Sequence, residues 1–214
     1  MAEYQLYCFA QSGNAYRVAL MLNLIGADWT PIFVDFFVKG EPRTPDYRAN
    51  INEMGEAPVL VHGAKKLSQS GVCLTYLARR SGKFKPEGED DELEALRWII
   101  FDNQKFNGYL GPYRFLRTLA KPPGDPTVLA FLKGRIDNSL AILDKRLAGR
   151  SYIVGNRPTI ADISLVGYLY FPPDEFGFDI AGAHKNIAAW LTRIKALPGW
   201  AHPYDLMPGH PLPK

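Results

Sequence analysis

The stretch Gly55-Glu56-Ala57-Pro58-Val59-Leu60, followed by Leu67-Ser68-Gln69-Ser70, decides the fold of the first part of the chain. Pro58 has no backbone N–H, so it predicts the edge or the first position of a strand rather than its middle. Ser68 or Ser70 is a suitable N-cap for a helix that follows. An open strand edge beside a helix N-terminus can hold a small peptide by its backbone and its carboxylate at once.

The residues around this stretch alternate between strand and helix patterns. The predicted elements are a strand at 5–9, a helix ending at Gly26, a strand at 29–35, a short helical or irregular segment at 45–50, a hairpin of 58–61 with 65–67, and a helix at about 69–79. The first crossover requires a parallel pair, and the hairpin adds antiparallel strands. A small mixed sheet with helices on both faces is therefore predicted, which is the thioredoxin-like layout among small α/β folds.

The composition changes after residue 81, and from Asp90 the strand signal nearly vanishes. Periodic apolar residues predict four helices, at about 93–119, 128–147, 159–170 and 187–197, with an extended proline-rich tail from Trp200. The predicted fold class is therefore α/β plus all-α. We expect a thioredoxin-like domain at residues 1–81, a linker at 82–87 and an all-helical domain at 88–214.

Composition excludes several classes of function. The chain has 214 residues and a formal net charge of +3 with interspersed signs, so the basic pairs Lys65-Lys66 and Arg79-Arg80 indicate solvated surface rather than a nucleic-acid site. It has no run of about 18 apolar residues and no signal-peptide pattern, so neither a membrane span nor secretion is expected. Cys8 and Cys73 read as buried, reduced thiols of a cytoplasmic protein, and no metal-ligand cluster is visible.

Three motifs resemble the soluble glutathione transferase family, and the resemblance covers almost the whole chain. The stretch 6–18 looks like the first strand, catalytic turn and first helix of the serine-type and bacterial classes. The opening stretch is similar to the family's cis-proline loop and its Glu/Gln-Ser pair. The stretch 155–163 resembles the capping box of its helical domain. The resemblance implies glutathione as co-substrate, a small hydrophobic electrophile as second substrate, and a homodimer.

The resemblance implies that the Ser12 hydroxyl activates the thiol of glutathione. A free thiol has a pKa of about 8.5, so a donor to the sulfur at a helix N-terminus would raise the thiolate fraction. The amide of Asn14 could also reach the sulfur, as in some bacterial members. Ser12 and Asn14 are equally the residue types that cap helices. Tyr7 is the rival, because other classes use a tyrosine near the end of the first strand, and it could instead line the electrophile pocket.

The resemblance also assigns the residues that hold glutathione. It implies a cis bond between Ala57 and Pro58 that turns the Ala57 backbone toward the cysteinyl residue. Gln69 and Ser70 would hold the γ-glutamyl end, where Gln69 lacks the charge of the glutamate that many relatives carry. Glu56 would sit near the glycyl carboxylate, an unfavourable position that Lys39, Arg43 or His62 could offset.

Other residues have structural readings beside the functional ones. Thr159 and Asp162 form a [ST]-x-x-[DE] capping box, which we assign to folding. Tyr109 and Tyr113 lie one turn apart on a predicted helix that faces the electrophile pocket in the family. An aromatic stripe at this spacing is also typical of a helical core.

We therefore expect a detoxifying glutathione S-transferase without a metal. One alternative is a glutathione-dependent disulfide or peroxide reductase on the same fold, in which Ser12 and Asn14 position the sulfur for exchange. The other is a non-enzymatic glutathione- or protein-binding module, because the same fold is used for assembly.

Overall fold

The computed structural model describes residues 2–212 and divides the chain into two compact units. The first unit contains residues up to Lys83 together with the tail from Pro198, and the second unit is Phe84–Leu197. The tail differs from expectation, since the sequence analysis placed it in the helical domain. The Tyr16 hydroxyl donates to the Ala201 carbonyl at 3.1 Å, and Gln11 Nε2 donates to the Pro211 carbonyl at 2.6 Å. These bonds join the tail to the first unit.

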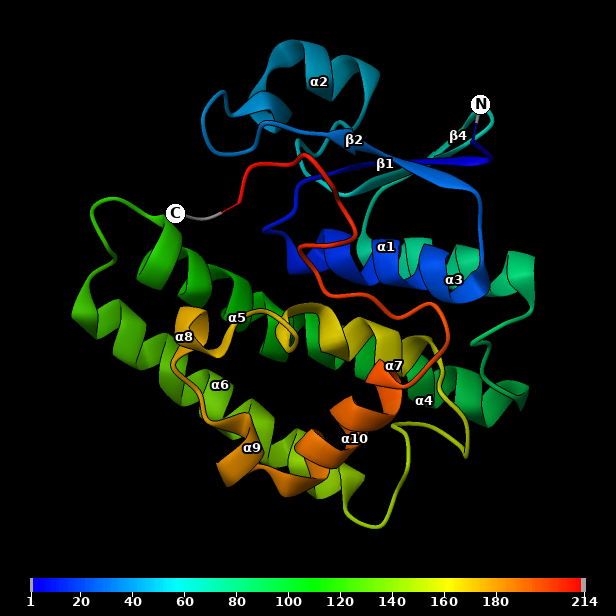
Figure 1. Ribbon diagram of the computed structural model, residues 1–214, viewed down its shortest axis with the longest axis vertical. Coiled ribbons are helices and arrows are strands. Elements are labelled where there is room, and N and C mark those ends of the chain that lie inside the picture. Colours follow the sequence, from blue (N-terminus) through cyan, green and yellow to red (C-terminus); the bar gives the residue numbers. More distant parts are fainter. Residues whose placement is uncertain (1, 213–214) are drawn as a thin grey trace. The chain divides into compact units, whose positions relative to one another are not determined.

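A four-stranded mixed sheet organises the first unit. Its elements are β1 (Tyr4–Cys8), α1 (Gly13–Ile25), β2 (Trp29–Phe33), the 3₁₀ turn η1 (Glu41–Arg43), α2 (Pro45–Asn50), β3 (Val59–His62), β4 (Lys65–Leu67) and α3 (Ser70–Ser81). The strand order is β2-β1-β3-β4, with β1 parallel to β2 and the other pairs antiparallel. Figure 1 shows α1 and α3 on one side of the sheet and α2 on the other. The thioredoxin-like layout is confirmed.

The side-chain pattern explains these elements. In β1 the side chains of Tyr4, Leu6 and Cys8 are buried, and the residues between them are half-buried, as expected for alternation across a pleated strand. Helix α1 is apolar around most of its circumference and is accordingly almost wholly buried. It ends at Gly26, whose φ of +75° is a left-handed conformation that glycine adopts without a steric penalty.

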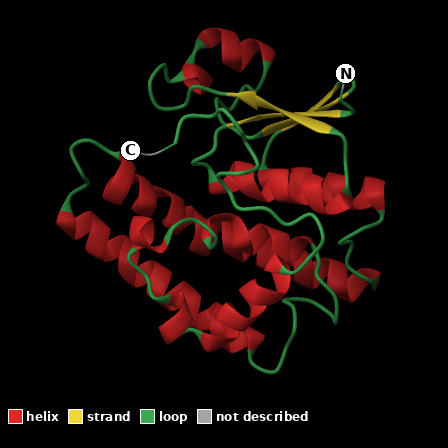
Figure 2. Cartoon of the chain, in the orientation of Figure 1, coloured by secondary structure: helices red, strands yellow, loops and turns green. Residues whose placement is uncertain are grey.

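Helices build the second unit, and its described residues contain no strand (Figure 2). They are α4 (Gly88–Phe101), the π turn η2 (Asp102–Phe106), α5 (Asn107–Arg114), the π turn η3 (Phe115–Leu119), α6 (Pro126–Leu147), α7 (Ile160–Leu165), the 3₁₀ turn η4 (Val166–Tyr168), α8 (Pro173–Phe176), α9 (Ile180–Ala183) and α10 (Lys185–Lys195). The all-helical class is confirmed. Between residues 2 and 212 no helix has the length and apolarity that a membrane crossing needs.

The predicted helix at 93–119 is divided by the two π turns. Asp102, in the first of them, is fully buried and accepts hydrogen bonds from the Ser164 hydroxyl at 2.5 Å and from the Asn107 side-chain amide. Pro112 further removes one backbone donor inside α5. Apolar periodicity is insensitive to such local widening. Helices α8 and α9 were not predicted, because four residues are too short for a periodic pattern.

The capping box at the start of α7 also ties together three segments of the second unit. The Thr159 N–H donates to Asp162 Oδ2 at 2.8 Å, and the Thr159 hydroxyl accepts from the Ala161 N–H at 3.3 Å. Asp162 Oδ1 also accepts from the Ile153 N–H and from Trp190 Nε1, each at 2.9 Å. Complete burial raises the pKa of Asp162 to about 6, against the lowering effect of these donors.

A second carboxylate, on Glu94 of α4, accepts from three side chains. Arg97 donates to both of its oxygens at 2.8 and 2.6 Å, and Trp98 Nε1 and the Arg146 guanidinium lie 3.0 and 2.9 Å from Oε1. The hydrogen bonds from Arg97 are the main reason that the pKa of Glu94 falls from its usual value near 4.5 to about 2. Because the side chain is only 27% exposed, this network links α4 to α6 more strongly than a surface ion pair would.

We predict that Glu94→Gln lowers the free energy of unfolding at pH 7 by about 1–2 kcal/mol. A carboxyl group whose pKa is depressed in the folded state stabilises above its unfolded pKa. The difference between wild type and variant should therefore shrink as the pH falls from about 4.5 toward 2. Urea unfolding of both proteins at several pH values measures this difference in the free energy of unfolding. Glu92→Gln, which removes an exposed ion pair with Lys85 at 3.6 Å, is the control and should change little. A difference independent of pH across this window would contradict the prediction.

Candidate functional site

Strand register brings three separate segments to one edge of the first unit's sheet. Tyr7 pairs with Val59 in the antiparallel β1–β3 ladder, and Leu60 pairs with Leu67 in the β3–β4 ladder. The C-terminal ends of β1 and β4 and the N-terminal end of β3 therefore meet at the same edge. The segments that continue from these ends carry all the glutathione-binding and thiol-activating candidates except Tyr7, which lies within β1 itself.

Ser12 is the N-cap of α1 and is 4% exposed. Its N–H donates to the Phe9 carbonyl at 3.0 Å, and its Oγ accepts from the Ala15 N–H at 3.1 Å. Capping thus uses Oγ as an acceptor, and among the described residues its hydroxyl hydrogen has no acceptor. The capping and donor roles of Ser12 are therefore compatible: the same oxygen can cap the helix and donate to a bound atom.

Asn14 is half-buried in the first turn of α1. Its side-chain carbonyl accepts a hydrogen bond from the guanidinium of Arg17, which is buried one turn further along the helix. The amide group of Asn14 is then the end that remains available as a donor. The Arg17 charge and the helix N-terminus both favour a negative charge near this turn.

The loop before β3 is held in a fixed conformation. The Glu56 carbonyl accepts from the Tyr47 hydroxyl at 3.1 Å and from Asn52 Nδ2 at 2.9 Å. Gly55 has a φ of +68°, and a Cβ there would approach the Pro42 carbonyl oxygen to 2.8 Å, so the position requires glycine. Tyr47 and Asn52 were not identified from the sequence, since nothing in their local pattern signals a contact with this loop.

The bond between Ala57 and Pro58 is cis, the isomer that the resemblance implies. Within residues 2–212, neither the N–H nor the C=O of Ala57 forms a hydrogen bond. Ala57 is half-buried, and Pro58 is buried behind it. A free donor and a free acceptor on one residue are what an extended peptide needs to add to a sheet edge.

The start of α3 differs from the expected cap. Its N-cap is Gln69, with a φ of +63°, and no side chain of the described chain caps the helix there, neither Ser68 nor Ser70. Ser70 is the first helical residue and is buried. The backbone N–H groups of Ser70 and Gly71 have no partner in the described part of the chain. Uncapped N–H groups at the start of a twelve-residue helix are suited to an anion.

Glu56, which the sequence analysis placed near the glycyl carboxylate, lies beside Gln69 in the structure. Gln69 Nε2 donates to Glu56 Oε2 at 2.9 Å and lies 3.4 Å from the Met54 sulfur. This bond uses the amide group of Gln69 and leaves its carbonyl oxygen as an acceptor. The Glu56 carboxylate and the Gln69 carbonyl oxygen are therefore two acceptors close together beside the start of α3.

His62 is removed from this edge, because it pairs with Tyr4 at the opposite end of the β1–β3 ladder. Its Nδ1 lies 2.6 Å from the Tyr76 hydroxyl and its Nε2 lies 3.5 Å from Glu3. It therefore does not offset the charge of Glu56. The Arg43 guanidinium stacks 5.0 Å from the centre of the Phe36 ring.

Tyr7 and the two cysteines have different surroundings. Tyr7 is half-buried in β1, and its side chain leaves the opposite face of the sheet from Cys8. Cys8 and Cys73 are both fully buried, and burial raises the pKa of each thiol to about 12. Neither thiol is ionised near neutral pH, so neither can act as a nucleophile there.

Tyr109 and Tyr113 both belong to α5 of the second unit. Tyr113 is buried, with its ring centre 5.5 Å from that of Phe178, which corresponds to the core alternative. Tyr109 is half-buried. No group of three or more His, Cys, Asp or Glu side chains within residues 2–212 is placed to hold a metal ion.

Two family models match the chain. The model of the glutathione S-transferase N-terminal domain matches residues 2–79, and that of the glutathione S-transferase C-terminal domain matches residues 113–198. Glutathione S-transferase 1 of Dianthus caryophyllus is 30% identical over 83% of this chain and 80% of its own length. Glutathione S-transferase 3 of Zea mays is 28% identical over 100% of this chain and 98% of its own length.

Solved structures agree with the family models. A crystal structure of glutathione S-transferase from Pseudomonas fluorescens superposes with a TM-score of 0.85 at 30% identity, covering 94% of this chain and 99% of that one. Ure2p in complex with glutathione superposes with a TM-score of 0.83 at 20% identity, covering 92% and 96%. At that identity the likeness to Ure2p shows the fold alone.

We predict that Cys8 and Cys73 resist alkylation in the folded protein. Incubation with iodoacetamide at pH 8, followed by mass spectrometry of the intact chain, should find neither thiol modified, and both modified in urea. The reason is burial, which excludes the reagent and keeps both thiols protonated. Rapid labelling of either cysteine under native conditions would contradict this prediction and would show that the labelled thiol is accessible and reactive.

Proposed function

The chain belongs to the glutathione S-transferase family, and we propose that its Ser12 activates the thiol of glutathione for transfer to small electrophiles. The observation that carries this proposal is the hydrogen bonding of Ser12, whose Oγ accepts from Ala15 while its hydroxyl hydrogen stays available. A hydrogen bond donated to the sulfur stabilises the thiolate over the thiol and lowers its pKa. The helix N-terminus and the Arg17 charge act in the same direction.

The reaction follows from the thiolate. The glutathione thiol loses its proton to solvent, and the sulfur lone pair attacks the electrophilic carbon, forming the C–S bond as a leaving group departs or a double bond opens. Ser12 donates to the sulfur before attack and holds it in position. The Asn14 amide is a second donor, oriented by the bond between its carbonyl and Arg17.

Glutathione would extend along the edge where the three segments meet. The free N–H and C=O of Ala57 would pair with the cysteinyl backbone, as in strand addition. Ser70 and the free N–H groups at the start of α3 would bind the γ-glutamyl carboxylate. Gln69 and Glu56 would bind the γ-glutamyl ammonium, so that Glu56 supplies the negative charge that Gln69 lacks.

The second substrate would be a small hydrophobic electrophile. Tyr7, Tyr109 and Tyr113 are the candidates to contact it. We propose further that the protein is a homodimeric, cytoplasmic enzyme of detoxification and that it has no nucleic-acid or membrane partner.

Disulfide or peroxide reduction is less favoured than transfer. Both cysteines are buried with a raised pKa, so the chain offers no thiol of its own for exchange. Reduction would instead need two glutathione molecules in succession. Turnover of a chlorinated aromatic with glutathione indicates transfer, and turnover of hydroxyethyl disulfide alone indicates reduction.

We predict that Ser12→Ala and Ser12→Gly both lower kcat/KM for a chlorinated aromatic by roughly 10- to 100-fold, because both remove the donor to the sulfur. Their stabilities should differ, since alanine loses about 1 kcal/mol of capping energy and glycine only a few tenths. Activity and thermal unfolding measured together separate the catalytic role from the cap. Ser68→Ala is the control and should match wild type. Full activity in Ser12→Gly would refute the assignment.

We predict that Glu56→Gln raises the Kd for glutathione by roughly 3- to 10-fold, because it removes a negative charge beside the substrate ammonium. Calorimetric titration measures the change. Glutathione acetylated on its γ-glutamyl nitrogen has no ammonium and should bind both proteins equally. Glu53→Gln, an exposed acid in the same loop, is the matched control. The assignment fails if Glu56→Gln weakens both ligands alike.

A further inference from the structure

A cluster of titratable side chains lies at the end of the first unit's sheet that is opposite the proposed glutathione site. His62 is the last residue of β3, and it pairs with Tyr4 of β1 and with Lys65 of β4. The carboxylate of Glu3 and the hydroxyl of Tyr76, which belongs to α3, both approach the His62 ring. Figure 1 shows the N-terminus beside β4 at this end of the sheet. The proposed transfer reaction uses none of these side chains.

The distances in this cluster are those of a hydroxyl, a base and a group that orients the base. The Tyr76 hydroxyl lies 2.6 Å from His62 Nδ1, and the Glu3 carboxylate lies 3.5 Å from His62 Nε2. A carboxylate beside Nε2 favours the tautomer with its proton there, so the lone pair of Nδ1 faces the hydroxyl. The Tyr4 ring, 4.5 Å from the His62 ring between centres, helps to fix the plane of the imidazole. A hydroxyl, a base and an orienting group in this order activate the hydroxyl oxygen as a nucleophile.

Reagents can reach this cluster from the solvent. The side chains of His62 and Glu3 are 21% and 52% exposed, Tyr76 is half-buried, and the hairpin residues 63–66 are exposed. The Lys65 ammonium lies 6.0 Å from the centre of the Tyr76 ring. Its positive charge favours the negative charge that develops on the phenol oxygen as the proton leaves.

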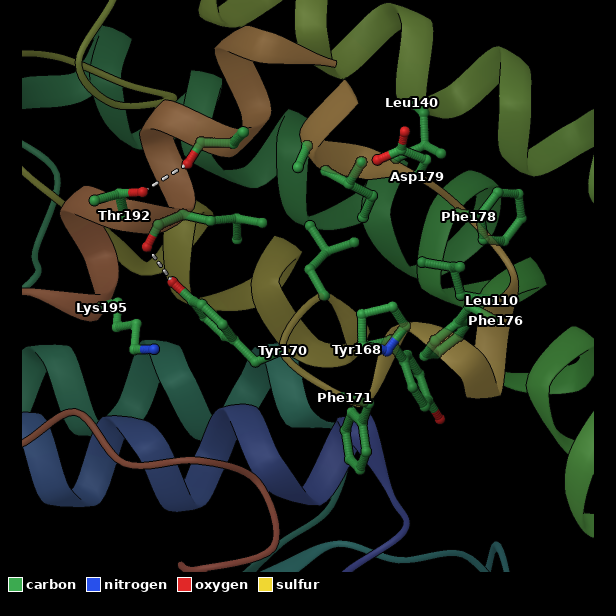
Figure 3. A pocket seen from close by; sticks show the side chains of 16 residues that line it. Leu110, Leu140, Tyr168, Tyr170, Phe171, Phe176, Phe178, Asp179, Thr192 and Lys195 are labelled. Atoms are coloured by element: carbon green, nitrogen blue, oxygen red, sulfur yellow. Dashed lines mark hydrogen bonds between the residues drawn. The ribbon is translucent and has the colours of Figure 1, made fainter. Parts of the chain in front are cut away.

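Tyr170 of the second unit is a tyrosine of similar burial without a base. It is also half-buried, but its hydroxyl donates to the Leu191 backbone carbonyl at 2.7 Å (Figure 3). A peptide carbonyl accepts a hydrogen bond and does not take up the proton near neutral pH. Tyr170 therefore measures, within the same chain, the reactivity that a half-buried phenol has without an imidazole beside it.

We propose that Tyr76 is a site of acylation by activated aryl esters, with His62 as its general base and Glu3 as the residue that orients His62. The Tyr76 oxygen attacks the carbonyl carbon of the ester while the phenol proton passes to His62 Nδ1. The new C–O bond forms, the bond from the carbonyl carbon to the aryl oxygen breaks, and the aryloxide leaves and takes up the proton. The products are an O-acyl-tyrosine and a free phenol. The reaction needs no glutathione.

The test incubates the whole protein with p-nitrophenyl acetate at pH 8 in the absence of glutathione. Mass spectrometry of the peptides should find an acetyl group on Tyr76, acquired at least roughly tenfold faster than on Tyr170. Hydroxylamine should remove this group, because it cleaves phenyl esters, whereas an acetyl amide on Lys65 would persist. His62→Gln cannot take up the proton and should slow acetylation of Tyr76 at least roughly tenfold. Glu3→Gln should slow it by a smaller factor, because the carboxylate is half exposed.

His202→Gln is the matched control, because the His202 ring contacts Tyr204 rather than Tyr76, and its Tyr76 should be acetylated as in wild type. Thermal unfolding shows that each variant is folded, and the comparison with Tyr170 in wild type needs no variant. Acetylation of Tyr76 no faster than that of Tyr170 would overturn the proposal. An unchanged rate in folded His62→Gln would overturn it as well, as would acetylation confined to lysine. None of these results bears on Ser12, so failure here is distinct from failure of the proposed transfer mechanism.

Discussion

The antiparallel pairing of β1 with β3 is the constraint on which the proposed glutathione site depends. With Tyr7 opposite Val59, the turn that carries Ser12 and the loop that carries Ala57 start from the same edge of the sheet. A register shift of one residue would send every side chain of the strand to the other face, burying polar groups and exposing Leu6 and Cys8. The hydrophobic pattern of β1 therefore fixes both the core of the first unit and the place where a peptide can bind.

In the second unit, buried polar residues fix how the helices pack against one another. Asp162 collects donors from the capping box, from Ile153 and from Trp190, and Asp102 collects donors from Ser164 and Asn107. Each carboxylate would be costly to bury alone, and each becomes tolerable because several donors converge on it. The contacts of Asp102 with Ser164 and of Asp162 with Trp190 join residues 62 and 28 positions apart, so they select one packing of helices that apolar periodicity alone would leave open.

Much of this organisation could be predicted from the sequence, and the exceptions have physical causes. The sheet elements, Gly26 at the end of α1 and the change to helices after residue 81 follow from periodicity and from glycine and proline chemistry. The hydrogen bond from Gln69 to Glu56 could not be predicted, since it depends on the left-handed backbone at Gln69. The π turn at Asp102 could not be predicted either, since Asp102 there accepts a hydrogen bond from Ser164, which is 62 positions away in the sequence. The tail was misassigned because its prolines interrupt any periodic pattern.

That tail makes the turn that carries Ser12 depend on residues far away in the sequence. The Pro211 carbonyl accepts from Gln11, the residue directly before Ser12, and the family models that match this chain end at residue 198. The segment that supplies this acceptor therefore lies outside the residues that the two family models match. Two proteins with the same serine and the same surrounding motif can differ in the residue that accepts the hydrogen bond from the position before the serine. A change at the tail would then alter the support of the turn while the motifs of the first unit stay unchanged.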